Sequence, residues 1–118
     1  MRVKEDLDAL ECPPKYKLMG QFEKFFNREL TAPILTIFVG GNHEASNLLR
    51  DIYYGGWVAE NIYYLGSSGV VQVRKGEQMI RVSGVSGIDK HYDYMRGYGE
   101  EWPYINDRDG LRSIYHIR

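Results

Sequence analysis

One short apolar run, followed at once by a polar loop, constrains the fold of this chain more than any other feature. Residues 34–39 read ILTIFV, with Pro33 before them and two glycines after them. A run of this length, rich in β-branched side chains and bounded by proline and glycine, predicts a buried β-strand. The polar residues Asn42, His43 and Glu44 follow, and residues 45–50 are expected to open a helix. The chain is therefore predicted to contain a strand, loop and helix unit of an α/β protein.

The loop places an amide, an imidazole and a carboxylate side by side. In open α/β sheets, ligands and catalytic groups gather outside the carboxyl ends of the strands. Neighbouring side chains on an extended backbone point in opposite directions, so Asn42 and His43 are not expected to serve one metal ion from the same side. The Asn42 amide oxygen suits a metal ligand, and the His43 imidazole suits proton donation to a leaving oxygen. The alternative is a solvent-exposed turn in which an asparagine caps the next helix.

The sequence GNHE after an apolar strand resembles the Gly-Asn-His-Asp/Glu motif of the calcineurin-like metallophosphoesterases. The longer strings GGNHEASN and YGGWVAENIYYLG resemble one branch of that superfamily, the RNA lariat debranching enzymes. The similarity continues through CPPKYKLM, SGVSGI and RSIYHIR. The resemblance implies an α/β fold, a partial metallophosphoesterase β-sandwich with flanking helices. Residues 1–88 would be its central part, and residues 89–118 would resemble the lariat recognition loop.

The resemblance also implies an activity, the metal-dependent hydrolysis of the 2′–5′ phosphodiester at the branch point of excised intron lariats. It implies a pair of divalent metal ions (Mn, Fe or Zn), with Asn42 as a ligand. His43 would be the catalytic residue that protonates the leaving 2′ oxygen or stabilises charge on the scissile phosphate. Glu44 would support this site without touching the metal. Because Asn and His accept all three metals, the residues leave the metal's identity open. The implied partner is branched intron RNA, and the implied location is the nucleus.

Most of the superfamily's metal-binding motifs are not found in this chain. No Asp-x-His or Gly-Asp occurs upstream of Pro33, and Gly-His-x-His occurs nowhere. We therefore expect an internal segment, truncated at both ends, that is inactive or nearly so alone and does not retain a metal pair. There are two alternatives to a segment of a lariat debranching enzyme. One is a fragment of a general metallophosphoesterase, and the other is a non-catalytic RNA-binding remnant.

The last thirty residues are rich in tyrosine, charge and glycine. Between Lys90 and Arg112, aromatic residues alternate with lysine and arginine, a pattern that favours base stacking and phosphate contact. The alternative is a solvated loop with aromatic anchors. The net charge of −1 gives no overall signal for nucleic acid, so any RNA contact would be local. His91 and His116 have no partner at ligand spacing and are expected to be structural.

The remaining sequence predicts short elements around the loop. Helices are expected over residues 1–11 and 15–27, the second packing against the strand after Pro33. Strands are expected over residues 61–66, 69–74 and 79–83, the last two joined by a turn at residues 75–78. The aromatic residues 53–57 either plug the core or offer faces for stacking bases. The small residues of 82–88 indicate a close backbone approach to a strand or to the site.

Two further features limit the class of protein. A single cysteine, Cys12, excludes an internal disulfide and fits a reducing compartment. No stretch is long and apolar enough to span a membrane, and the first residues lack the apolar core of a signal peptide. We therefore expect an intracellular protein with no membrane partner and no disulfide partner.

Overall fold

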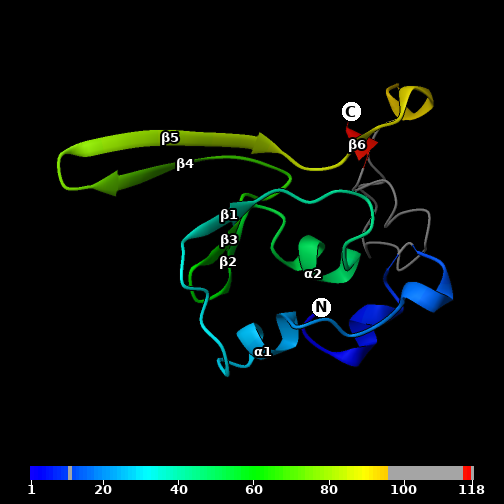
Figure 1. The fold of residues 1–118 in the computed structure, drawn as a ribbon. Helices are drawn as coiled ribbons and strands as arrows, with labels where there is room; N and C mark the ends of the chain where they lie inside the picture. The colour runs from blue at the N-terminus through cyan, green and yellow to red at the C-terminus, as the bar shows by residue number, and fades with distance from the viewer. Residues whose placement is uncertain (11, 96–115, 118) are drawn as a thin grey trace.

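The computed structural model describes residues 1–10, 12–95 and 116–117, which form a mixed α/β arrangement (Figure 1). The helical elements are short, with η marking 3-10 helices: η1 (Lys4–Leu7), η2 (Pro14–Tyr16), α1 (Phe22–Phe26), α2 (Ser46–Asp51) and η3 (His91–Asp93). The strands are β1 (Thr36–Phe38), β2 (Gly56–Ala59), β3 (Ile62–Tyr64), β4 (Ser68–Lys75), β5 (Gln78–Val85), β6 (Ile88–Asp89) and β7 (His116–Ile117).

A three-stranded sheet in the order β1-β3-β2 forms the centre of the described molecule. Strand β1 runs parallel to β3, with Phe38 opposite Tyr64, and β2 runs antiparallel to β3. The turn between β2 and β3 contains Asn61 at φ 60°, a left-handed conformation that asparagine tolerates better than most residues. Because β1 and β3 are parallel, their carboxyl ends lie at the same edge of the sheet. The loops that follow these two strands are therefore neighbours.

The core lies on the sheet face that α2 covers. Leu49 of α2, Val58 of β2 and Tyr64 of β3 are buried together. Four half-buried apolar residues pack around them: Phe22, Phe38, Ile52 and Ile62. Each buried aliphatic or aromatic side chain stabilises the fold by about 1.5–3 kcal/mol. Helix α2 is thus held against the sheet immediately after the polar loop.

The opposite face of the sheet is open among the described residues. Leu35, Ile37, Trp57 and Tyr63 line a groove of about 430 Å³ with residues of β4. The prediction of a buried strand over residues 34–39 is therefore wrong in part, because Ile34 is 74% exposed and Leu35 is 42% exposed. The apolar run has only one covered face, and its regular pairing with β3 is confined to the three residues of β1.

The strands β4 and β5 form a long antiparallel hairpin that extends away from the central sheet (Figure 1). The predicted strands are confirmed and are longer than expected. Lys75 pairs with Gln78, so the turn is Gly76-Glu77, shorter than the four residues predicted. Gly76 has φ 61°, which is the conformation that a two-residue hairpin turn requires.

The amino-terminal helices are much shorter than predicted. The stripe over residues 15–27 forms only α1, and Tyr16, expected on its apolar face, is 60% exposed. A glycine at position 20 and two prolines before the stripe interrupt the helical conformation. Helix α1 lies against β2, whereas the prediction placed it on the strand after Pro33. The helix predicted over residues 1–11 is reduced to the 3-10 turn η1 within the described part.

Two features of the described part of the chain concern membranes and disulfides. No helix there combines the length and apolarity needed to cross a bilayer. Cys12 is a half-buried free thiol.

Candidate functional site

The polar loop lies at the edge of the sheet where β1 and β3 both end. Leu65 follows β3 and donates its backbone N–H to the Phe38 carbonyl at 3.0 Å, so the two strand ends are in contact. The loop residues Asn42, His43 and Glu44 come directly after this contact and before α2. The predicted position at the carboxyl end of a strand and the predicted helix opening are both confirmed.

The two principal candidates differ in exposure. Asn42 is half-buried, whereas His43 is exposed. Residues 42–44 form bends and not the extended backbone that the prediction assumed, so this difference in exposure does not follow from strand alternation. Their roles as metal ligand and proton donor stay predictions.

Glu44 turns back onto its own loop. Its Oε2 accepts the backbone N–H of His43 at 3.1 Å. A Cβ on Gly41 would lie 3.5 Å from both carboxylate oxygens, so the carboxylate rests on the loop backbone. The proposed supporting role of Glu44 is compatible with this placement, which holds the backbone on both sides of Asn42.

Ser86, in the segment that leaves β5, joins the loop to the end of β3. Its Oγ accepts the Gly40 N–H at 3.0 Å and donates to the Gly66 carbonyl at 2.6 Å. Gly87 donates its N–H to the Gly40 carbonyl at 2.8 Å. The sequence indicated a close approach by residues 82–88, and the structure shows that the approach is to the loop itself.

Tyr64 lies beneath this junction and is 2% exposed. Burial raises the pKa of its phenol, a hydrogen bond with Ser86 opposes that change, and the negative charge of Glu44 adds to it. The phenol is therefore held in its neutral form well above neutral pH, and it remains a hydrogen-bond donor next to the loop.

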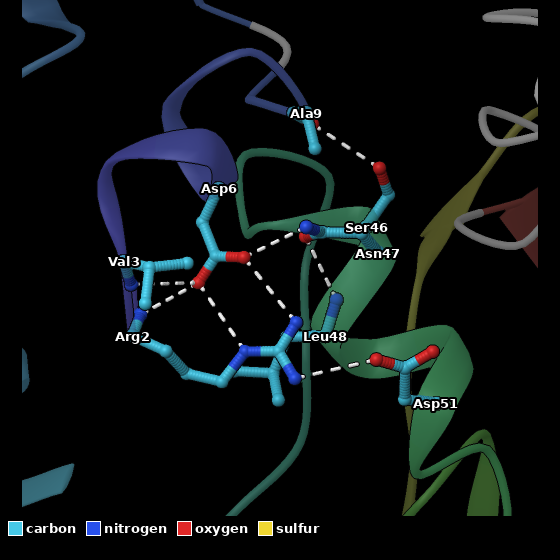
Figure 2. A network of polar contacts seen from close by, with 8 residues as sticks. All are labelled: Arg2, Val3, Asp6, Ala9, Ser46, Asn47, Leu48 and Asp51. Carbon is cyan, nitrogen blue, oxygen red and sulfur yellow. Dashed lines mark hydrogen bonds and ion pairs between the residues drawn. The ribbon is translucent and has the colours of Figure 1, made fainter.

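A buried ionic cluster fixes α2 on its other side (Figure 2). The Asp6 side chain has no solvent exposure, and it pairs with Arg2 at 3.3 Å. Its Oδ2 accepts the backbone N–H groups of Arg2 at 2.6 Å and Val3 at 3.4 Å, and its Oδ1 accepts Asn47 Nδ2 at 2.7 Å. Arg2 also reaches Asp51 at 3.3 Å. The amino-terminal segment is thereby tied to the first and last turns of α2.

The first residue of α2 adds a second link to the amino-terminal segment. Ser46 is 1% exposed, and its hydroxyl donates to the Ala9 carbonyl at 3.1 Å. The loop from Gly41 to Glu44 is therefore held at its start by Ser86 and at its end by the amino-terminal segment. Sequence reasoning missed Asp6, Ser46 and Tyr64 as supports of the loop, because single polar or aromatic residues carry no local signal of such a role.

Only a small part of the candidate RNA region is described, since residues 96–115 lie outside the described residues. Within that part, Lys90 Nζ lies 5.4 Å from the Tyr92 ring centre, and His91 stacks edge-on against the same ring at 5.3 Å. Tyr92 and Tyr94 are exposed. Strand β6 pairs in parallel with β7, so residues 89 and 117, on either side of the candidate region, lie close together.

The aromatic cluster after α2 lies at the surface. Tyr54 is 92% exposed and packs edge-on against Tyr53, while Trp57 is 62% exposed and packs edge-on against Tyr63. The alternative of a core plug is therefore wrong for Tyr54 and Trp57. Their exposed faces are available for stacking, which stays a prediction.

The metal-ligating side chains among the described residues would fill only one part of a metal site. Within those residues, no three histidine, cysteine, aspartate or glutamate side chains lie close enough together to hold an ion. The half-buried Asn42 amide oxygen suits a single ligand position, since hard divalent ions accept neutral oxygen.

Curated proteins of high similarity cover the entire chain. It is 52% identical over 114 residues to the lariat debranching enzyme of Drosophila melanogaster, a match that covers 97% of the chain and 20% of that enzyme. It is 49% identical over 118 residues to lariat debranching enzyme A of Xenopus laevis and 46% identical over 118 residues to the lariat debranching enzyme of Arabidopsis thaliana. These two matches cover the whole chain and 21% and 27% of the respective enzymes. No protein-family model matches. The chain spans about a fifth to a quarter of the length of these relatives.

Proposed function

We propose, because the whole chain is homologous to one segment of the lariat debranching enzymes, that it forms part of an RNA lariat 2′–5′ phosphodiesterase. Such an enzyme hydrolyses the branch-point phosphodiester of excised intron lariats. The structural observation that supports the proposal is the Asn42-His43-Glu44 loop at the shared carboxyl edge of β1 and β3. In this proposal the sheet β1-β3-β2 belongs to one layer of a metallophosphoesterase β-sandwich.

The loop residues have distinct proposed roles. A bound pair of divalent ions would activate water and neutralise charge on the scissile phosphate. Asn42 would hold one ion through its amide oxygen. His43, which is exposed, would reach the substrate and protonate the leaving 2′ oxygen. Glu44 would hold the loop backbone in the conformation that presents both side chains.

The substrate in this proposal is branched RNA, and the compartment is the nucleus. The segment that leaves β5 contacts the loop through Ser86 and continues directly into β6 and η3. The exposed rings of Tyr92 and Tyr94 therefore follow within a few residues of Ser86, which contacts the loop, and Lys90 lies beside Tyr92. Rings of this kind stack on unpaired bases, and the ammonium group can contact a phosphate.

A segment exchange tests the proposal. The chain replaces the matching fifth of the Drosophila enzyme, and the chimera is incubated with a labelled lariat and Mn²⁺. We expect branch cleavage by the chimera and none of a linear 3′–5′ RNA. The 118-residue chain alone should cleave little, because one recognisable ligand, Asn42, is too few to hold two ions.

Two substitutions in the chimera assign the roles. His43→Ala is expected to lower the rate about 10²–10⁴-fold, the range for loss of a general acid. Asn42→Ala should raise the Mn²⁺ concentration needed for half-maximal rate. Asn27→Ala, at an exposed asparagine beside α1, is the matched control and should change neither value. An inactive chimera that still binds branched RNA would instead favour the non-catalytic RNA-binding alternative.

A further inference from the structure

We infer that Ser86 is a positioning residue, whose hydroxyl holds the Gly40 backbone and so sets the direction in which Asn42 and His43 leave the loop. The catalytic consequence rests on the function proposed above. The structural part rests on the hydrogen bonds alone and can be tested without any activity.

The Ser86 hydroxyl makes two hydrogen bonds to the backbone, one as donor and one as acceptor. A hydroxyl offers one donor and two acceptor sites. Its donor goes to the Gly66 carbonyl at 2.6 Å, and one acceptor site receives the Gly40 N–H at 3.0 Å. One side chain therefore joins the end of β1, the end of β3 and the segment after β5.

The backbone next to Ser86 strengthens the same contact. Ser86 donates its own N–H to the Ser67 carbonyl at 2.8 Å, and Gly87 donates to the Gly40 carbonyl at 2.8 Å. Both polar groups of Gly40 are thus paired to two consecutive residues. Because Gly40 is buried, its N–H would lose its partner on removal of the hydroxyl, and the local backbone would have to move to find another.

A movement of the Gly40 backbone would affect the candidate site because of where Gly40 lies. A Cβ there would lie 2.7 Å from Leu49 Cδ1, so the backbone is in tight contact with α2. Gly41 alone separates Gly40 from Asn42, and the Glu44 carboxylate lies against Gly41, which limits how far Gly41 can rotate to absorb a movement of Gly40. A rotation at Gly40 therefore passes directly to the side chains of Asn42 and His43.

The same residue connects the loop to the start of the candidate RNA region. Only one residue separates Ser86 from β6, and η3 follows soon after. Ser86 thus fixes the catalytic loop relative to the first exposed tyrosines. Ser86 therefore helps to place the reacting side chains relative to bound RNA.

Three substitutions and one control test this inference. Ser86→Ala removes the hydroxyl, Ser86→Cys keeps the side-chain volume but offers only a weak donor and acceptor, and Ser86→Thr keeps the hydroxyl. Ser83→Ala removes a hydroxyl from an exposed position on β5. If the Ser86→Ala variant does not fold, the Ser86→Cys variant is compared with the unaltered chain in its place.

The first readout is amide hydrogen exchange of Gly40 in the 118-residue chain, measured by NMR. The Leu65 amide, which bonds the Phe38 carbonyl, is the internal reference for general unfolding. We expect Ser86→Ala and Ser86→Cys to speed Gly40 exchange about tenfold relative to Leu65, the effect of losing one typical hydrogen bond. Ser86→Thr and Ser83→Ala should leave the ratio unchanged. An unchanged ratio in both the alanine and the cysteine variants would overturn the inference.

The second readout is lariat cleavage by the chimera that carries the same substitutions. Misplaced reacting groups lower kcat while the affinity for RNA is retained, so we expect kcat to fall about tenfold or more with KM unchanged. Ser86→Thr should restore kcat. If the unaltered chimera is inactive, the proposed function fails and the exchange ratio alone decides the inference. If the chimera is active and Ser86→Ala keeps full kcat, the positioning role is refuted and the function stands.

Discussion

Replacing Asp6 by asparagine tests whether the buried ionic cluster holds the amino-terminal segment on α2. Five N–H contacts converge on the two oxygens of this carboxylate: three on Oδ2 and two on Oδ1. The shortest is at 2.6 Å, from the Arg2 backbone, on Oδ2, and the next is at 2.7 Å, from Asn47, on Oδ1. An asparagine has one oxygen, so either orientation places its NH₂ group against one of these short donors.

The expected loss follows from the burial of Asp6. Removing one partner of a buried ion pair costs about 3–5 kcal/mol. Arg2 keeps 22% side-chain exposure, so water can satisfy part of its charge, and the loss should be smaller than for a fully buried pair. We expect Asp6→Asn to lower the free energy of unfolding by about 2–3 kcal/mol, with hydrogen bonds to a charged group worth about 1.5–3 kcal/mol.

The assay is urea and thermal unfolding of the 118-residue chain at pH 7, with Asp51→Asn as the matched control. Asp51 pairs with the same arginine, but its side chain is 55% exposed, so its loss should cost about 0–1 kcal/mol. For a chain of this size, the Asp6 variant should melt roughly 10 °C lower. Equal effects of the two substitutions would refute the argument that burial makes the Asp6 cluster important.

The pH dependence has a definite sign. Burial by itself would raise the pKa of Asp6, but hydrogen bonds from Arg2 and Asn47 and the charge of Arg2 outweigh it, so the pKa is lowered. A lowered pKa stabilises the fold above the ordinary carboxyl value, and this contribution is lost as pH falls through the folded value. The difference between Asp6→Asn and the unaltered chain should therefore be largest at neutral pH and shrink below about pH 4.

Two further predictions concern the residues that surround the loop. Gly40→Ala would place a Cβ 2.7 Å from Leu49 Cδ1, and thermal unfolding should show a loss of about 1–3 kcal/mol. Gly20→Ala, where a Cβ meets nothing within 4 Å, should cost nothing, and a similar loss at both sites would contradict the packing argument. The pKa of Tyr64 is raised by burial, so its neutral form stabilises the fold at low pH and this contribution is lost as pH rises from the unfolded value near 10. Tyr64→Phe should reduce the fall in the free energy of unfolding between about pH 9 and 11, measured by urea unfolding. An unchanged fall would show that a group other than Tyr64 causes the loss of stability at alkaline pH.

Local sequence patterns were enough to predict the strand, loop and helix unit and the hairpin. The β-branched run before two glycines marks β1, and the apolar and polar pattern of residues 46–51 marks α2. Helix α2 forms from residues close in sequence, and the β-branched run and its flanking glycines are local signals of β1, although the partner strand β3 is distant in sequence. The same holds for Asn42, His43 and Glu44, since they lie together in one loop and form a recognisable motif.

Only the tertiary structure shows which residues hold that loop in place. Ser86 reaches Gly40 across 46 positions, and Asp6 reaches Asn47 across 41. Which donor meets which acceptor over such distances depends on how the strands and the amino-terminal segment pack, and no local pattern encodes it. The same dependence explains why β1 kept one open face, whereas Gly20 within the stripe over residues 15–27 is a local signal against a continuous helix. The sequence by itself determined which side chains could perform the chemistry. The tertiary structure decided where those side chains lie, because their loop packs against β3, the segment after β5 and the amino-terminal cluster.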